Sequence, residues 1–197
     1  MSNPAESSAD VRAALLAAAR AELAGHGHAG ISLRAVARRA GVSHAAPKYY
    51  FRDRGALLTA VAAQGFAELA GALRQGPPTL AALGHAYITF ALANPALFDL
   101  MFRPSELHPA DPDLRQAETD AIGVLDAAVT AGEASGKDAR AASGELTMIS
   151  WALAHGLAVL VRDGALRSAS EHGQHSNAEL AYHLVDVFTQ RLKQLAQ

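Results

Sequence analysis

The sequence contains no cysteine, and this absence excludes several kinds of site. A chain without thiols can form neither disulfides nor thiolate metal sites, and it has no cysteine nucleophile. Its stability must therefore come from packing, for which 197 residues with 50% hydrophobic composition provide ample material. The lack of disulfides fits a reducing compartment, and we expect a cytoplasmic protein.

Long hydrophobic runs are also absent. The longest apolar stretch, residues 148–161, has 14 residues and contains Ser150, His155 and Gly156. It is shorter than the roughly 20 residues that a membrane-spanning helix needs. The first ten residues lack the ordered basic, apolar and cleavage regions of a signal peptide. We therefore expect a buried helix at 148–161, no signal peptide and no membrane partner.

Signals for strands and for common enzyme sites are missing as well. No stretch shows the sustained alternation and β-branched enrichment of a strand, and no nucleophile elbow, phosphate loop or metalloprotease signature occurs. The histidine pairs His26/His28 and His172/His175 lie in glycine-containing loops without a clear carboxylate partner at metal spacing. We expect an all-α protein that is not an enzyme, binds no metal or cofactor, and leaves these histidines solvated.

Charge is unevenly divided along the chain, although the net charge is only −2. Residues 1–55 hold eight basic and four acidic side chains, whereas the other 142 residues have a net charge of −6. The N-terminal part can therefore meet a polyanion. On charge alone, a chance imbalance on a solvated surface explains the pattern equally well.

Helical patterns separated by glycine and proline run through the whole chain. We expect each helix to begin at a capping residue and to end at a glycine or before a proline. The predicted helices cover residues 10–24, 33–40, a short segment from 43, 53–73, a segment after 78 that ends at 93, a short apolar piece at 96–102, 113–134, 138–163 and 177–195.

Two short helices joined by a turn are the first functional signal. Ser32 can cap the first helix, Gly41 can adopt the left-handed turn, and Ser43 can cap the second. This is the helix-turn-helix design, in which the second helix enters the major groove of DNA. Taken alone, such a pattern is often only a helical corner.

The segment from Gly30 to Leu58 resembles the DNA-binding domain of the TetR family of transcriptional repressors. The matching positions are Ser32, Leu33, Val36, Ala37, Ala40, Gly41, Val42, Ser43, Tyr50, Phe51, Arg54, Leu57 and Leu58. Two further motifs are similar to those of one subgroup: His-Ala-Ala-Pro at 44–47 and Trp-x-x-x-His-Gly at 151–156. Arg54 stands where the family usually has lysine, and Gly55 stands where an acidic residue is more common.

The resemblance implies a homodimer of all-helical subunits. We expect an N-terminal three-helix DNA-binding domain at 1–52 and an effector-binding and dimerisation domain at 53–197. The implied function is a repressor that binds a palindromic operator in double-stranded DNA and is released by a small-molecule effector. A helical scaffold or partner-binding protein without DNA affinity is the alternative, and an operator-binding test separates the two.

The candidate DNA-binding residues form two groups by the chemistry that they offer. Hydroxyls, charge and helix N-termini suit phosphate contacts, for which we select Ser32, Ser43, Tyr50 and Arg54. Side chains able to reach base edges are Arg34, His44, Lys48 and Tyr49. Tyr49 can alternatively pack against the protein.

Three neighbouring features have structural interpretations. We expect Phe51 in the core of the small domain, and Arg38 and Arg39 on a solvated face. Pro47 would remove the first intrahelical hydrogen bond of the second helix. That helix should therefore begin about one residue late, near His44, or have a distorted first turn.

The rest of the chain offers candidates for ligand binding and dimerisation. The candidate effector residues are aromatic, sulfur-containing or polar side chains: Phe66, Tyr87, Phe90, Phe98, Met101, Phe102, Met148, Trp151 and His155. Each of these is individually more typical of plain core. The implied dimer interface is a four-helix bundle whose last helix contributes Leu180, Leu184, Val187 and Phe188.

Overall fold

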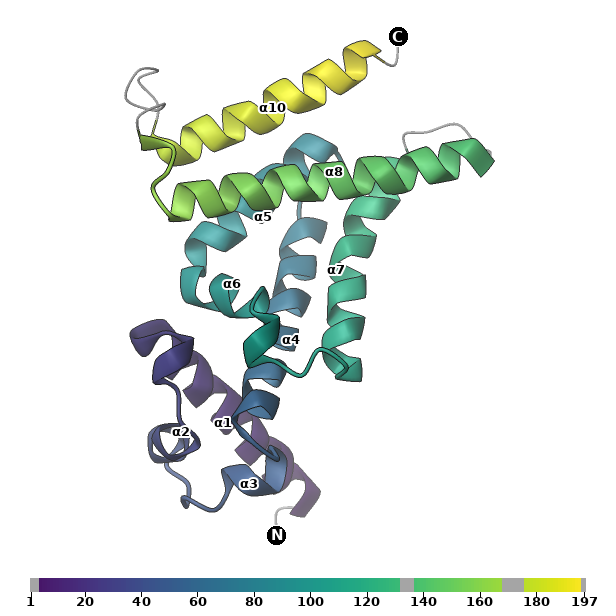
Figure 1. The fold of residues 1–197 in the computed structure, drawn as a ribbon. Coiled ribbons are helices and arrows are strands. Elements are labelled where there is room, and N and C mark those ends of the chain that lie inside the picture. Colours follow the sequence, from purple (N-terminus) through teal and green to yellow (C-terminus); the bar gives the residue numbers. More distant parts are fainter. Residues whose placement is uncertain (1–3, 132–136, 168–175, 196–197) are drawn as a thin grey trace. The chain divides into compact units, whose positions relative to one another are not determined.

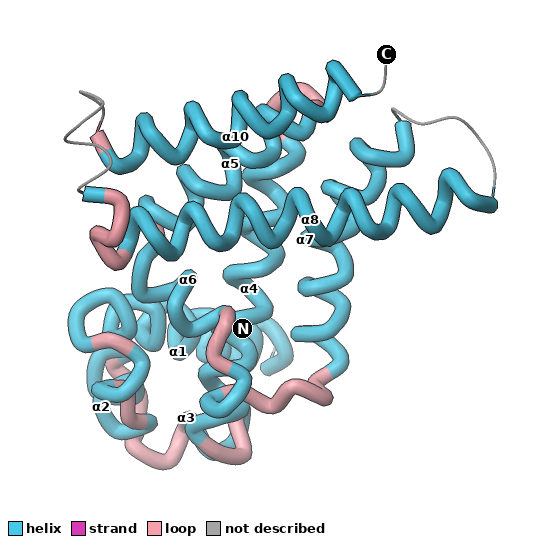
Figure 2. Tube along the Cα trace, turned by 45° about the horizontal axis from the view of Figure 1, so that its top comes forward, coloured by secondary structure: helices cyan, strands magenta, loops and turns pink. Residues whose placement is uncertain are grey.

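The computed structural model describes residues 4–131, 137–167 and 176–195, and the regular elements in these ranges are all helical (Figure 1). The α-helices are α1 (Pro4–His26), α2 (Leu33–Ala40), α3 (Pro47–Tyr50), α4 (Arg54–Arg74), α5 (Leu80–Ala93), α6 (Pro95–Met101), α7 (Pro112–Ala131), α8 (Lys137–Arg162) and α10 (Asn177–Leu195). Two 3-10 helices, η1 (His28–Gly30) and η2 (Pro104–Glu106), lie between them. Figure 2 shows no strand within the described ranges, so the predicted all-α class is confirmed.

Side-chain and glycine caps define most helix ends where the sequence predicts them. Ser32 Oγ accepts a hydrogen bond from Ala35 N at 3.2 Å, and Gly41 ends α2 with φ 70°. Asp53 Oδ1 accepts from Ala56 N at 2.7 Å at the start of α4. One difference is α1, which begins at Pro4 instead of Asp10, because proline is well suited to the first helical position.

The chain divides into two compact units. Unit 1 consists of Met1–Phe66 and Ala96–Glu118, and unit 2 consists of Ala67–Pro95 and Thr119–Gln197. Unit 1 therefore contains α6, η2 and the start of α7 in addition to the N-terminal helices. These units do not follow the boundary at residue 52, which stays a prediction about where the two functions divide.

In unit 1, α1, α2 and α3 pack on one another around a small apolar core. Leu15, Val36 and Leu57 are fully buried there. Phe51 is only 3% exposed, and the Arg12 guanidinium lies 5.6 Å from its ring centroid. The prediction that Phe51 closes this core is confirmed.

In unit 2, α5 packs against both α8 and α10. The approach of α5 to α10 requires a glycine, because a Cβ at Gly84 would lie 2.7 Å from Cγ1 of Val185. Ile88 of α5 and Ala158 of α8 are fully buried, as is Ala181 of α10. These helices form the core of the unit.

Two described helices, α4 and residues 144–162 of α8, are long and apolar enough to cross a membrane by length and composition alone. The rest of the chain buries these two helices to different degrees. In the most apolar 18-residue stretch of each helix, 56% is buried in α4 but only 22% in α8. The helix expected at 148–161 is present, and the single chain buries only part of it. The chain covers one side of α8 and leaves Met148, Ile149 and Leu160 exposed.

Candidate DNA-binding interface and effector site

The α2–turn–α3 pair forms the predicted helix-turn-helix. After Gly41 turns the chain, Val42 N donates to Ala37 O at 3.1 Å, which ties the turn back to α2. The apolar side of α2 buries Val36 and Ala37, whereas Arg34 and Arg38 lie on its exposed side. The helix pair thus presents a polar surface and an apolar one.

The start of α3 differs from the sequence prediction. The helix begins at Pro47 instead of near His44, and its N-cap is Ala46 without a side-chain hydrogen bond. The predicted cap by Ser43 is therefore wrong. Because Pro47 has no N–H to donate to Ser43 O, the chain uses tighter bonds, from Ala46 N to Ser43 O at 3.0 Å and from Lys48 N to Ala45 O at 3.1 Å. The distorted first turn, the other expected outcome, is what the structure shows.

Most candidate DNA-binding side chains are exposed on this motif. Tyr49 is 84% exposed, so it does not pack against the rest of the chain. Tyr50 is half-buried. The exposed candidates are Ser32, Arg34, Ser43, His44, Lys48 and Tyr49. Within the part of the chain that the structure describes, neither Arg34 nor Lys48 has an ion-pair partner.

Arg39 is held by an acidic residue of α1. Its Nε donates to Glu22 Oε1 at 2.6 Å, and the Glu22 side chain is only 8% exposed. Arg39 thus joins α2 to α1, which corrects the expectation that it is merely solvated. Its neighbour Arg38 is exposed and has no ion-pair partner among the described residues.

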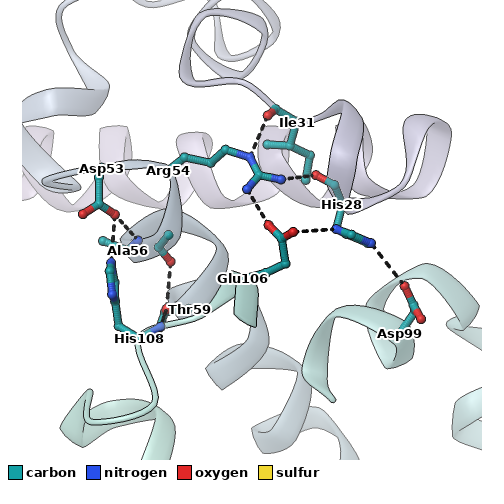
Figure 3. A network of polar contacts seen from close by, with 10 residues as sticks. His28, Ile31, Asp53, Arg54, Ala56, Thr59, Asp99, Glu106 and His108 are labelled. Carbon is teal, nitrogen blue, oxygen red and sulfur yellow. Dashed lines mark hydrogen bonds and ion pairs between the residues drawn. The ribbon is translucent and has the colours of Figure 1, made fainter. Parts of the chain in front are cut away.

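Arg54 has a similar structural role. Its Nε donates to Ile31 O at 3.0 Å, and its Nη2 donates to His28 O at 2.5 Å. Its Nη1 donates to Glu106 Oε2 at 2.6 Å (Figure 3). This bond, with help from the nearby positive charges, holds the pKa of the Glu106 carboxyl below its ordinary value. Arg54, selected as a phosphate contact, has all three guanidinium nitrogens bonded within the protein.

His28 also lies against carboxylates, which corrects the expectation that it is solvated. Its Nε2 is 3.7 Å from Asp99 Oδ2, and its Nδ1, which is buried, is 3.6 Å from Glu106 Oε1. The Nδ1 atom of His26 lies 3.4 Å from Oε2 of Glu22. In the ranges that the structure describes, no group of three possible ligands is arranged to hold a metal ion. The pair His172/His175 lies outside the described residues.

A second set of contacts involves His108, which follows η2. Its Nε2 is 2.9 Å from Asp53 Oδ1, and its backbone N donates to Thr59 Oγ1 at 2.8 Å. Thr59 Oγ1 in turn donates to Gly55 O at 2.7 Å. Hydrogen bonds from His108 and from the Ala56 amide lower the pKa of the Asp53 carboxyl. Asp53 is therefore ionised at neutral pH.

The sequence patterns did not reveal the side chains that hold this motif in place. Glu22, Glu106 and His108 each bind a partner 17 or more positions away, and no local pattern marks such pairs. One signal was available, namely the unusual Gly55. A Cβ at this position would lie 2.9 Å from His108 Nε2, so the glycine makes room for the histidine.

The nine candidate effector residues are divided between the two units. In unit 1, Phe98 and Met101 are buried in α6, and the Phe102 ring lies 5.4 Å from that of Phe66 and 5.0 Å from that of Phe98. Unit 2 holds Tyr87, Phe90, Met148, Trp151 and His155. Of these, Met148 is 53% exposed. The assignment of all nine to an effector site stays a prediction.

The polar centre of the unit 2 group is a buried tyrosine. Tyr87 Oη lies 2.9 Å from His155 Nδ1. The Trp151 and His155 rings are 5.8 Å apart. Burial raises the pKa of the Tyr87 hydroxyl and lowers the pKa of the His155 imidazole, so both groups are neutral at pH 7. The Trp-x-x-x-His-Gly motif thus places an uncharged hydrogen-bonded group between α5 and α8.

The side of α10 that its own unit leaves uncovered contains apolar side chains. The residues of this helix that its own unit buries are Ala181, Val185 and Thr189. Leu184 and Val187, by contrast, are 36% and 38% exposed. Of the four candidate interface residues, Leu184 and Val187 are therefore exposed on the single chain, whereas Leu180 and Phe188 are partly buried.

Comparison with known proteins identifies the family. Residues 80–188 match the model "Tetracyclin repressor-like, C-terminal domain", and residues 15–61 match "Bacterial regulatory proteins, tetR family". The chain belongs to the TetR family of transcriptional regulators. Members of the TetR family are DNA-binding regulators and not enzymes.

Individual TetR-like relatives agree with this assignment. An HTH-type transcriptional regulator of Mycobacterium tuberculosis is 31% identical over 137 residues, or 64% of this chain and 58% of the relative. The chain therefore spans less than two thirds of the curated relatives that it matches. A solved protein of unknown function from Rhodococcus sp. RHA1 is 34% identical, with 91% of this chain and 94% of that chain covered and a TM-score of 0.73. A TetR family transcription regulator from Marinobacter aquaeolei has the same fold, with a TM-score of 0.60. It is 23% identical, and the match covers 91% of this chain and 95% of that chain.

Proposed function

We propose that this TetR-family regulator is a repressor that binds a palindromic operator as a homodimer and leaves it when a small-molecule effector binds. The observation that supports DNA binding most directly is the exposed surface of α2 and α3. Arg34 and Lys48 have no ion-pair partner among the described residues, and Tyr49 of α3 is exposed. Cations of this kind bind phosphates or the acceptor atoms of guanine.

A homodimer accounts for the exposed apolar side of α8 and α10. Leu184 and Val187 of α10 are partly exposed, as are Met148 and Ile149 of α8. Covering such a surface with a second copy is the usual way to remove it from water. A two-fold dimer would place two copies of α3 about 34 Å apart, in successive major grooves, and would therefore select a palindrome.

We assign operator binding to residues 1–52, and effector binding and dimerisation to residues 53–197. In this scheme the effector contacts the candidate residues of the central helices and shifts α4, which begins next to the DNA-binding helices. The neutral group Tyr87–His155 can hydrogen-bond to an effector without attracting a charged one. Such a regulator acts where the DNA is, in the cytoplasm.

The test is selection of DNA by the full chain from a random duplex library at a stated salt concentration. We expect enrichment of a palindrome whose half-sites are about one helical turn apart. The variant Lys48→Ala should bind the selected duplex more weakly. If the wild-type chain enriches no sequence, the proposal fails and the alternative, a helical scaffold without DNA affinity, takes its place.

A further inference from the structure

The side chains of Glu106 and His108 bond to the side chains of two residues at the start of α4, Arg54 and Asp53 (Figure 3). Glu106 Oε2 accepts from Arg54 Nη1 at 2.6 Å, and His108 Nε2 lies 2.9 Å from Asp53 Oδ1. Between them, Leu107 is buried. We refer to these three residues, Glu106–His108, as the docked segment. It belongs to the same compact unit as the DNA-binding helices.

Arg54 extends this attachment to the chain that leads into α2. Its other two nitrogens donate to the carbonyl oxygens of His28 and Ile31. The next residue, Ser32, caps α2. The Arg54 guanidinium thus bonds the chain just before the α2 N-terminus to the start of α4, in addition to the apolar packing of α2, and Glu106 is the only carboxylate bonded to that guanidinium within the described residues.

Gly55 leaves room for the His108 side chain of the docked segment. A Cβ at residue 55 would lie 2.9 Å from His108 Nε2 and 3.2 Å from Asp53 Oδ1. Any larger residue would therefore require the His108 ring to shift from its place beside Asp53. Arg54 and Gly55 thus both accommodate the docked segment, Arg54 by bonding to Glu106 and Gly55 by leaving room for His108.

We propose that Glu106 and His108 are positioning residues for operator binding, which act through Arg54 and Asp53 without touching DNA. Groups that contact a ligand must be held within about 0.5 Å of their productive position. The docked segment fixes Arg54, and Arg54 fixes the chain that carries Ser32 and the start of α2. This inference rests on the proposed function, since it concerns the affinity of the same DNA-binding surface.

Electrostatics alone predicts the opposite effect for Glu106, which allows a sharp test. Removing a negative charge from a DNA-binding unit reduces its repulsion of phosphates and should strengthen binding. A positioning role predicts weaker binding, because Arg54 loses its charged partner and its orientation. The sign of the change therefore distinguishes the two effects.

The experiment uses the full chain and the duplex that the wild type selects from a random library. We expect Glu106→Gln to bind this duplex about tenfold more weakly, a change equal to about 1.4 kcal/mol. The dependence of affinity on salt should be unchanged, because no phosphate contact is lost. The matched control is Asp113→Asn, which removes the same charge from an exposed residue of α7 in the same unit, and it should bind as well as the wild type or slightly better. Equal or tighter binding by Glu106→Gln would overturn the inference.

A second variant keeps the test independent of folding defects. Gly55→Ala leaves every charge in place but should displace His108, so it too should weaken binding. Both variants are assayed well below their melting temperatures, and hydrogen exchange of the amides that follow Ser32 should be faster in both. Unchanged exchange and unchanged affinity in Gly55→Ala would also count against the inference. If the wild type itself selects no duplex, the proposed function fails instead.

Discussion

Glu22 Oε1 lies 2.6 Å from Arg39 Nε, and this pair joins α1 to α2. The Glu22 side chain is 8% exposed, so a carboxylate is almost buried in the core of unit 1. A buried carboxylate needs a charged or hydrogen-bonded partner. Arg39 is therefore committed to the fold, whereas Arg34 and Arg38 are exposed on α2.

The first prediction concerns the pH dependence of the Glu22–Arg39 pair. The Arg39 hydrogen bond lowers the pKa of the Glu22 carboxyl from its ordinary value near 4.5. A group with a lowered folded-state pKa stabilises the protein fully above its unfolded pKa, and this contribution is lost as the pH falls through the folded value. Glu22→Gln should therefore melt several degrees below the wild type at neutral pH, and the difference should shrink below about pH 4.5. Thermal melting of both proteins across this range checks it, and a constant difference would contradict it.

The second prediction concerns Lys48, which we propose as a DNA contact. Lys48→Ala should weaken binding to the selected duplex and reduce the slope of log affinity against log salt by about one, if Lys48 contacts a phosphate. Arg74→Ala removes an equal charge from the exposed end of α4 and should leave the slope unchanged. Arg39→Lys keeps its charge and should also leave the slope unchanged. Titrations at several salt concentrations provide the measurement, and a Lys48→Ala protein with both the affinity and the slope of the wild type would exclude Lys48 from the interface.

Local sequence patterns predicted those features that depend on neighbouring residues. Ser32, Gly41 and Asp53 mark helix ends through bonds within a few residues, and Phe51 is buried where the apolar pattern places it. The start of α3 was missed because Pro47 has two effects. It removes a hydrogen bond, as expected, but it also favours the first position of a helix, so the regular helix begins at the proline itself.

Contacts between distant residues could not be predicted in the same way. Arg54 suits a phosphate contact by residue type, and only the fold shows that Glu106, 52 positions away, binds it. The apolar stripe of α10 is visible in the sequence, but its direction is not. The structure shows that Ala181 and Val185 face the core and that Leu184 does not.

The third prediction concerns this outer side of α10. Leu184→Asp places a charge on an apolar surface that we assign to the dimer interface, and it should raise the dimer dissociation constant at least about tenfold, because a buried unpaired charge is costly. Gln190→Asp adds the same charge to an exposed polar residue of α10 and serves as the control. Sedimentation equilibrium measures the constants. A fully dimeric Leu184→Asp protein would show that the interface lies elsewhere.

The fourth prediction concerns Tyr87 and His155. Tyr87 is 5% exposed, and its hydroxyl lies 2.9 Å from His155 Nδ1. Tyr87→Phe leaves the imidazole with one partner fewer and should lower the free energy of unfolding by about 1–2 kcal/mol. Urea denaturation at pH 7 measures this change, and a variant as stable as the wild type would show that the bond contributes nothing net.

The same pair should make stability depend on pH through the histidine. Burial lowers the pKa of His155, so the unfolded state takes up a proton more readily than the folded state does. The free energy of unfolding should therefore fall as the pH drops through the unfolded value of about 6.5. His155→Gln cannot take up this proton, so it should lose less stability than the wild type between about pH 7.5 and pH 5.5. Comparing the two proteins cancels the contributions of the other histidines, and equal losses would show that His155 titrates alike in both states.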